Sequence, residues 1–239
     1  MGIPSATSHH LLPPRPSCAT DYVGYSASLD TVVVGHQGTN PTKLIADLTD
    51  IRLLQGRPDP ALFPNITRSA LVHLGFRDEH ARTARNILEE VTALMGALKT
   101  TRVAVVGHSL GGALAELDAV YLALNLPAAL KRGGNTAVNV TVKAVTFGKP
   151  RVGNAAWATL VDEHVDIVPV IPSRHLNYEH PRGEVHLLGA GNAVACPGND
   201  DAYDPECQIQ TVPTILQGNV LDHLGPYEGV SIGTIYCVA

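Results

Sequence analysis

Short apolar runs rich in β-branched residues alternate along the chain with segments whose apolar positions recur every three or four residues. The β-branched runs predict strands, because such side chains favour extended backbone. The predicted strands are Thr31–Gly35, Ser69–Leu74, Arg102–Gly107, Val138–Phe147, Asp166–Ile171 and Glu184–Leu188. Strands that alternate with helices usually pair in parallel, so the pattern predicts an α/β fold with a mostly parallel central sheet flanked by helices.

The segments of helical periodicity fall between these strands. Glu79–Leu98 carries one apolar stripe and predicts an amphipathic helix with one buried face. The stripe consists of Ala81, Ala84, Ile87, Leu88, Val91, Leu94, Met95 and Leu98. Further helices are predicted from Ser109 to about Asn125 and from Asn154 to about His164. Gln55–Pro64 holds three prolines and a glycine and predicts a surface loop.

Composition narrows the class of protein. The 239 residues include 45% hydrophobic and only 16% charged positions, enough apolar material for one sizeable core. We expect a flexible segment over residues 1–21 and a single domain over residues 22–239. The 17 Lys and Arg residues form no basic stripe, which argues against nucleic acid as a partner. The most apolar region, Val103–Leu130, contains His108, Glu116 and Asp118, so no integral membrane segment is expected.

The cysteines and two glycosylation sequons indicate whether the protein works inside or outside the cell. Cys18, Cys196, Cys207 and Cys237 fit no zinc spacing, so they predict no metal site. Cys196 and Cys207 bracket a turn-rich loop that a disulfide would staple, which leaves Cys18 and Cys237 as a second candidate pair. The sequons at Asn65 and Asn139 are compatible with secretion. An extracellular location is therefore expected, although the first residues show no signal peptide. The alternative is an intracellular chain with reduced thiols and no glycan.

The clearest candidate for chemistry is Ser109. It lies in Gly107-His108-Ser109-Leu110-Gly111, directly after a predicted strand and at the start of a predicted helix. This is the G-x-S-x-G pattern in the context of a nucleophile elbow, where a tight turn presents the serine hydroxyl at the end of a strand. The helix N-terminus behind the serine favours developing negative charge.

A serine nucleophile needs a histidine base and an acid that orients the histidine. In α/β folds with a nucleophile elbow, these residues follow one another in the order serine, acid, histidine. Asp166 is the favoured acid, because it lies where an apolar strand runs toward two prolines. Asp162 and Glu163 fall in a helical segment, and Asp118 lies on the helix of the nucleophile itself. The histidines that follow Asp166 are His175, His180, His186 and His223. Spacing alone favours His223 without excluding the others, and His180 could instead have a structural hydrogen-bonding role.

Five motifs together carry a family resemblance. In order they are GHSLGGALAELDA, TFGKPRVGNAAWA, DIVPVIP, YEHPRGEVHLL and DHLGPYEG, and the chain from about Tyr22 to Cys237 resembles the fungal class 3 lipases. The resemblance implies an α/β-hydrolase fold, hydrolysis of carboxylic esters at Ser109, Asp166 as the acid and His223 as the base. It also implies an oxyanion hole formed by the Leu110 backbone N–H and by Thr39. The serine-based chemistry inferred from the motifs implies no cofactor.

The segment after Thr39 is a candidate lid. Asn40 can cap a helix, Pro41 suits its first position, and Leu44, Ile45 and Leu48 would share one face. In the resembled family this stretch covers the site in water and contacts lipid at an interface, whereas a helix packed permanently on the core would have the same pattern.

Two features depart from the family pattern. Gln37 stands where the family often has arginine, and only about twenty residues precede the YVGYSASLD segment, where the family usually has a further helix. The resemblance implies a lipase acting on acylglycerols through an acyl-enzyme, with a lipid or other ester as substrate and a transient lipid–water interface as partner. A feruloyl-type esterase and a non-catalytic binding protein on the hydrolase scaffold are the alternatives.

Overall fold

The computed structural model describes residues 21–38, 54–134, 139–162, 174–189, 192–199 and 204–211, together with the single positions 223, 225, 227, 230 and 232. The predicted strand Asp166–Ile171 lies outside the described residues. So does the segment expected to be flexible, except for Asp21, which is the first residue of a strand.

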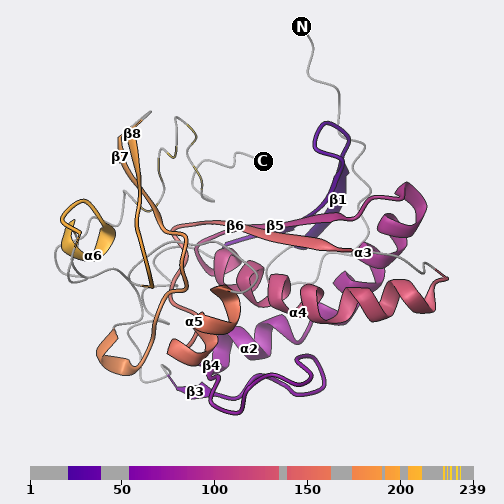
Figure 1. Ribbon diagram of the computed structural model, residues 1–239, viewed down its shortest axis with the longest axis horizontal. Coiled ribbons are helices and arrows are strands. Elements are labelled where there is room, and N and C mark those ends of the chain that lie inside the picture. Colours follow the sequence, from indigo (N-terminus) through magenta and orange to yellow (C-terminus); the bar gives the residue numbers. More distant parts are fainter. Residues whose placement is uncertain are drawn as a thin grey trace, which may run out of the picture.

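A four-stranded sheet forms the centre of the fold (Figure 1). Its strands are β1 (Asp21–Ser26), β2 (Thr31–His36), β5 (Arg102–His108) and β6 (Thr141–Phe147), in the order β1-β2-β5-β6. β1 pairs with β2 antiparallel, whereas β2–β5 and β5–β6 are parallel. The α/β class with a mostly parallel sheet is thus confirmed. The register places His36 opposite Gly107, so β2 ends beside the turn that carries Ser109.

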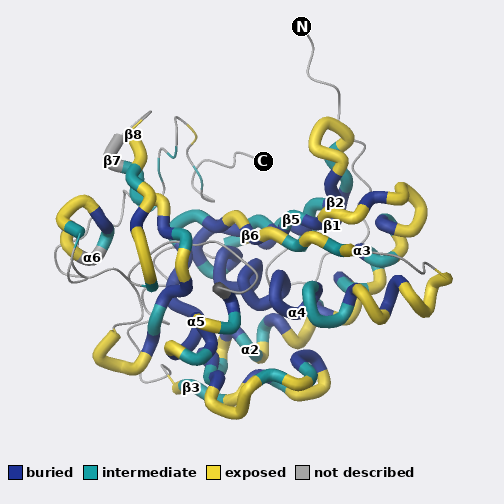
Figure 2. The backbone as a smooth tube through the Cα atoms, viewed as in Figure 1, coloured by how far each residue is buried: buried dark blue, intermediate teal, exposed yellow. Residues whose placement is uncertain are grey.

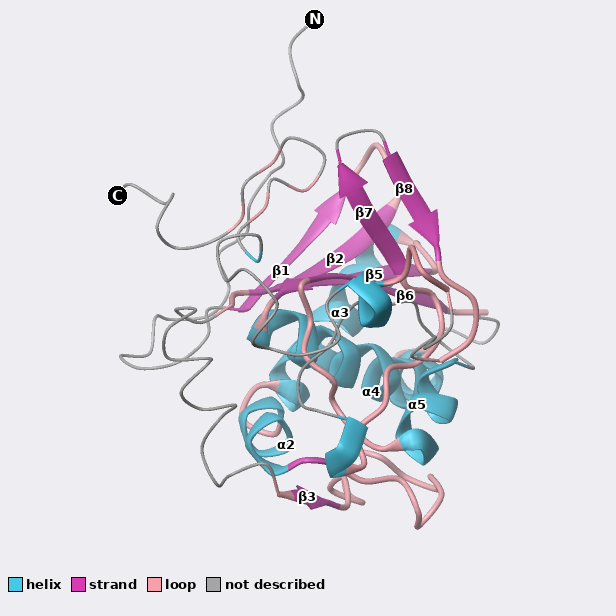
Figure 3. Ribbon diagram, turned by 90° about the vertical axis from the view of Figure 1, so that its left-hand side faces the viewer, coloured by secondary structure: helices cyan, strands magenta, loops and turns pink. Residues whose placement is uncertain are grey.

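The longer helices cover one face of this sheet (Figures 1 and 3). They are α2 (Leu74–His80), α3 (Ala84–Leu98), α4 (Leu110–Arg132) and α5 (Ala155–Asp162). α3 buries Ala84, Ile87, Val91 and Met95, which belong to the predicted stripe. The single helix predicted over Glu79–Leu98 is wrong at its start, because a turn at 81–83 separates α2 from α3. The turn lets His80 end α2 inside the core, where it meets a buried carboxylate.

α4 is the central helix of the core (Figure 2). It runs past the predicted end near Asn125 to Arg132 and contains Pro127. Leu126, Ala129 and Leu130 beyond or beside the proline are buried, and their packing holds the helix together where the proline weakens its hydrogen bonding. By length and composition α4 could cross a membrane, but 72% of its most apolar window is buried inside the protein. It packs against β5, β6 and α3 as a core helix.

Smaller elements extend the fold at two ends. β3 (Gln55–Gly56) pairs with β4 (Val72–His73), so the strand predicted over Ser69–Leu74 is much shorter than expected. The predicted surface loop Gln55–Pro64 is wrong at Leu62 and Phe63, which are buried. The Phe63 ring packs against the rings of His80, Tyr121 and Trp157, at centroid distances of 5.4, 6.0 and 5.7 Å. Tertiary contacts with residues of α2, α4 and α5 therefore explain why Phe63 is buried.

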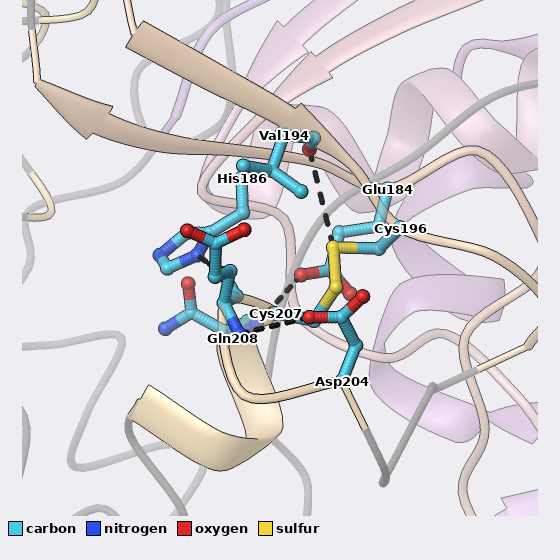
Figure 4. Close-up of a disulfide and its surroundings, with 8 residues drawn as sticks. Glu184, His186, Val194, Cys196, Asp204, Cys207 and Gln208 are labelled. Atoms are coloured by element: carbon cyan, nitrogen blue, oxygen red, sulfur yellow. Dashed lines mark hydrogen bonds between the residues drawn. A yellow bond between two sulfur atoms is a disulfide. The ribbon is translucent and has the colours of Figure 1, made fainter.

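A disulfide ties a hairpin to a short helix. β7 (Val185–Gly189) and β8 (Asn192–Ala195) form the hairpin, 3-10 helix η1 (Arg174–Leu176) precedes it, and α6 (Gln208–Thr211) follows. Cys196 and Cys207 are bonded, with their Cα atoms 5.9 Å apart, as the sequence predicted (Figure 4). Glu184 strengthens the same junction, since its backbone accepts from Cys196 N and its side chain from Gln208 N. Cys18 and Cys237 lie outside the described residues.

Candidate active site

Ser109 occupies the tight turn between β5 and α4, as predicted. Its backbone has φ 59° and ψ −128°, a conformation that costs free energy in a residue other than glycine. The chain passes so closely here that side chains would collide. A Cβ at Gly107 would lie 2.1 Å from the Gly111 carbonyl oxygen, and one at Gly111 would lie 2.3 Å from that of His36. The two glycines therefore allow the strained serine to sit at the helix N-terminus.

His223 lies beside this turn although it is far away in the sequence. The rings of His108 and His223 are 4.5 Å apart between centroids, and His108 Nε2 donates to the His223 carbonyl oxygen at 2.7 Å. Tyr227 Oη donates to the same carbonyl at 3.1 Å. Gly148, with φ 53°, makes room for the imidazole, because a Cβ there would lie 2.7 Å from His223 Nδ1. The fold thus brings His223 next to the residue that precedes Ser109.

The surroundings keep this pair of histidines uncharged at neutral pH. Burial, reinforced by the neighbouring His108, lowers the pKa of His223 to about 4. Burial also lowers the pKa of His108, against the opposing effect of its hydrogen bond to the His223 backbone. Within the described part of the chain, Ser109 Oγ and His223 Nε2 are both buried and have no hydrogen-bond partner. Such atoms are rare in folded proteins, and a catalytic role is one explanation for them. A neutral imidazole can accept a proton.

The other histidines considered as bases are placed differently. His175 is exposed on η1, and His186 Nδ1 contacts the Glu206 carbonyl oxygen. His180 is buried, with its Nδ1 3.2 Å from Lys149 Nζ, in agreement with a structural hydrogen-bonding role. Asp166 lies outside the described residues.

The Gln37–Gly38 backbone, directly after β2, packs against the Ser109 turn and forms a wall of the candidate site. A Cβ at Gly38 would lie 2.7 Å from the His108 carbonyl oxygen and 3.3 Å from Ser109 Cβ. Leu110 is the first residue of α4, so its N–H belongs to the helix N-terminus. Thr39 and the candidate lid residues Asn40, Pro41, Leu44, Ile45 and Leu48 lie outside the described residues.

A buried chain of charges, which the sequence did not reveal, joins β1, β2, α2 and α4. Asp118 of α4 has one carboxylate oxygen 2.8 Å from His36 Nε2 and the other 2.9 Å from His80 Nε2. His36 Nδ1 in turn lies 2.8 Å from Asp21 Oδ1. Burial alone would lower the pKa of His36, but hydrogen bonds to Asp118 and Asp21 raise it to about 9. The available signal was an acidic residue inside an apolar helix, since a buried charge must be paired.

A second buried group lies on another face of α4. Glu116 accepts from Trp157 Nε1 at 2.7 Å, and its other oxygen lies 2.7 Å from Lys149 Nζ. The Glu116 and Lys149 side chains are fully buried, and Lys149 also donates to the Pro150 carbonyl oxygen at 3.1 Å. Lys149 follows Gly148, the residue against which His223 packs. This group therefore ties the wall behind His223 to the helix that carries Ser109.

Two further kinds of site are the glycosylation sequons and a candidate metal cluster. The sequon residues Asn65 and Asn139 are both exposed. Among the described residues, Glu184, Cys196 and Cys207 have ligand atoms close enough for a metal. The two sulfurs are joined in the disulfide, so they do not offer the thiolates that a metal would bind.

Comparison with known proteins identifies the family of the chain. Residues 33–175, more than half of the chain, match the family described as lipase (class 3). The chain belongs to the class 3 lipase family. Its fold is accordingly of the α/β-hydrolase type.

Three similar proteins illustrate the relationship. Secreted mono- and diacylglycerol lipase MDL3 of Malassezia globosa is 30% identical over 224 residues, covering 88% of this chain and 68% of the relative. Secreted mono- and diacylglycerol lipase LIP2 of Malassezia restricta is 28% identical over 221 residues, covering 86% of this chain and 64% of the relative. A solved triacylglycerol lipase, described as having a serine protease triad as its catalytic centre, superposes with TM-score 0.66 and 26% identity. That match covers 89% of this chain and 77% of the solved one.

The chain is shorter than these class 3 lipases. It spans 64% of the length of the LIP2 relative.

Proposed function

We propose that the chain is a serine-dependent carboxylic ester hydrolase that acts on acylglycerols. The observation that carries the proposal is the strained Ser109 turn at the end of β5 with the neutral imidazole of His223 beside it. A serine at such a turn is presented to substrate, and a buried neutral histidine is in the state that a general base needs. The names of the similar lipases support acylglycerols as the substrate class.

The proposed reaction is acyl transfer in two steps. His223 takes the proton from the Ser109 hydroxyl while the oxygen attacks the ester carbonyl, and the Leu110 N–H and Thr39 hold the negative oxygen. His223 then gives its proton to the leaving alcohol. Water activated by His223 attacks the acyl-enzyme and releases the fatty acid. Asp166 is assigned the role of orienting the imidazole and stabilising its cation.

The proposal also covers the lid over the candidate site, the extent of the catalytic domain and the location of the protein. Asn40–Leu48 is assigned as a lid that contacts the lipid surface, and residues 22–239 as one catalytic domain. The word "secreted" in the names of the relatives and the Cys196–Cys207 disulfide support an extracellular location, since disulfides persist in oxidising compartments. Production in a eukaryotic secretory host tests the location. Glycosidase treatment should reduce the mass if Asn65 or Asn139 carries a glycan, and an unchanged mass argues against both glycan sites.

Hydrolysis of a soluble p-nitrophenyl ester and of mono-, di- and triacylglycerol emulsions tests the function, with Ser109→Ala beside the parent. Loss of the nucleophile should lower kcat by at least about a thousandfold. Ser28→Ala, at an exposed serine in the β1–β2 turn, is the matched control and should retain full activity. A rate increase above the solubility limit of the substrate supports the lid.

Three results would contradict parts of the proposal. Cleavage of soluble and phenolic esters without acylglycerols replaces the lipase with a feruloyl-type esterase. Activity that survives in Ser109→Ala removes Ser109 as the nucleophile. A folded parent that cleaves no ester overturns the proposed function.

A further inference from the structure

The end of β2 contacts α4 at two points on one face of the helix. The first is a backbone contact, because the carbonyl group of His36 lies so close to Gly111 that a Cβ there would be 2.3 Å from the oxygen. The second is the His36 side chain, whose Nε2 is 2.8 Å from Asp118 Oδ2. Gly111 and Asp118 are seven residues apart on α4, which is two turns and therefore the same face.

The His36 ring is held from both sides. Its Nδ1 faces Asp21 of β1 and its Nε2 faces Asp118 of α4, each at 2.8 Å. A carboxylate at each ring nitrogen favours a proton on both, so the ring is an imidazolium with a charge-assisted hydrogen bond to Asp21 and an ion pair to Asp118. The His36, Asp21 and Asp118 side chains are at most 2% exposed. The ring therefore cannot turn without leaving a buried carboxylate unpaired.

The His36 side chain, held between Asp21 and Asp118, directly precedes the Gln37–Gly38 wall of the candidate site. Gln37 and Gly38 follow His36 directly, and Gly38 packs against the His108 carbonyl and Ser109 Cβ. We propose that His36 is a positioning residue of the catalytic centre, which holds the Gln37–Gly38 backbone against the Ser109 turn through its ion pair with Asp118. The inference rests on the proposed function for its effect on catalysis, and on the contacts above for its effect on structure.

His80 provides a matched control within the same cluster. Its Nε2 lies 2.9 Å from the other oxygen of Asp118, and its side chain is as buried as that of His36. It comes from the end of α2, however, and not from the strand that lines the site. Loss of either histidine thus removes one partner of Asp118, but only loss of His36 releases the wall beside Ser109.

The experiment compares His36→Asn with His80→Asn on a soluble p-nitrophenyl ester, after circular dichroism has established folding. Asparagine is too short to keep either contact with Asp118. A displacement of about 1 Å at a catalytic wall costs about a hundredfold, so His36→Asn should lower kcat by about that factor. Its KM should stay within about threefold of the parent, because the wall acts on the developing charge more than on bound substrate. His80→Asn should keep kcat within about threefold of the parent.

The longer glutamine provides a rescue test. His36→Gln keeps a neutral donor that can reach Asp118 and should recover about tenfold of the lost kcat. If His36→Asn does not fold, the His36→Gln and His80→Gln pair makes the same comparison, with a drop of about tenfold expected only for the former. Equal kcat values for the variants at the two positions would overturn the inference.

Hydrogen exchange gives a readout that does not depend on activity. Amides in Gln37–Gly38 and Gly111–Gly112 should exchange about tenfold faster in His36→Asn, whereas His80→Asn should instead loosen α2. The same exchange pattern in both variants would also overturn the inference. If the parent shows no Ser109-dependent hydrolysis, the proposed function fails, and the exchange pattern alone decides whether His36 holds the wall.

Discussion

Replacing Lys149 by Met should destabilise the protein strongly at neutral pH. Lys149 Nζ is 2.7 Å from Glu116 Oε2, and both side chains are fully buried. Methionine has a similar length and little cavity is expected, so the main effect is electrostatic. The Glu116 carboxylate would keep the Trp157 Nε1 donor but lose its ion-pair partner.

The magnitude follows from the cost of a buried, unpaired charge. Breaking a buried pair by removing one partner costs about 3–5 kcal/mol. A carboxylate can escape such a site by binding a proton, which costs about 1.4 kcal/mol for each pH unit above about 4.3, the pKa of an ordinary glutamate side chain. The electrostatic part of the loss of unfolding free energy is therefore limited to about 4 kcal/mol at pH 7 and about 1 kcal/mol at pH 5. The lost donor to the Pro150 carbonyl oxygen adds a part that does not depend on pH. At pH 7 the electrostatic part lowers Tm by roughly 8–16 °C.

Urea denaturation followed by circular dichroism at pH 7 and pH 5 measures the effect. Lys143→Met, at an exposed lysine on β6, is the control and should stay within about 0.5 kcal/mol of the parent. The double variant Lys149→Met with Glu116→Gln should recover at least about half of the loss, since a neutral amide oxygen can still accept from Trp157. A loss below about 1 kcal/mol at pH 7, or one equal at both pH values, would refute the reasoning.

Two further predictions concern other parts of the fold. Replacing Cys196 and Cys207 by serine should cost about 3 kcal/mol, as expected for a loop closed over a sequence separation of 11, and urea denaturation measures the loss. An unfolding free energy unchanged from the parent would show that the bridge adds nothing. Stability should also fall by up to about 3 kcal/mol as the pH rises from 6.5 to 9, because the folded state raises the pKa of His36 to about 9 and binds its proton more tightly than the unfolded state. Urea midpoints across this range should fall less in Asp118→Asn, and an equal fall in both proteins would assign the effect to another group.

Features with a local origin could be predicted from the sequence. The β5–Ser109–α4 unit follows from a β-branched run, a G-x-S-x-G turn and a helical pattern within about a dozen residues, each of which acts over neighbouring residues only. The Cys196–Cys207 bridge has the same character, because both cysteines flank one short loop. Family motifs then added His223, which spacing alone had not separated from the other histidines.

Long-range packing decided the rest. His223 lies beside His108 although 115 residues separate them, and the charges of α4 find partners on β2, α2 and the segment after β6. The Glu79–Leu98 pattern could not show the turn at 81–83, since nothing in its apolar spacing records that His80 must reach Asp118. Phe63 is buried for a similar reason, because the aromatic rings around it come from three other segments. A sequence specifies periodicity and turns locally, whereas the partner of a buried charge or ring is chosen by the topology that brings distant segments together.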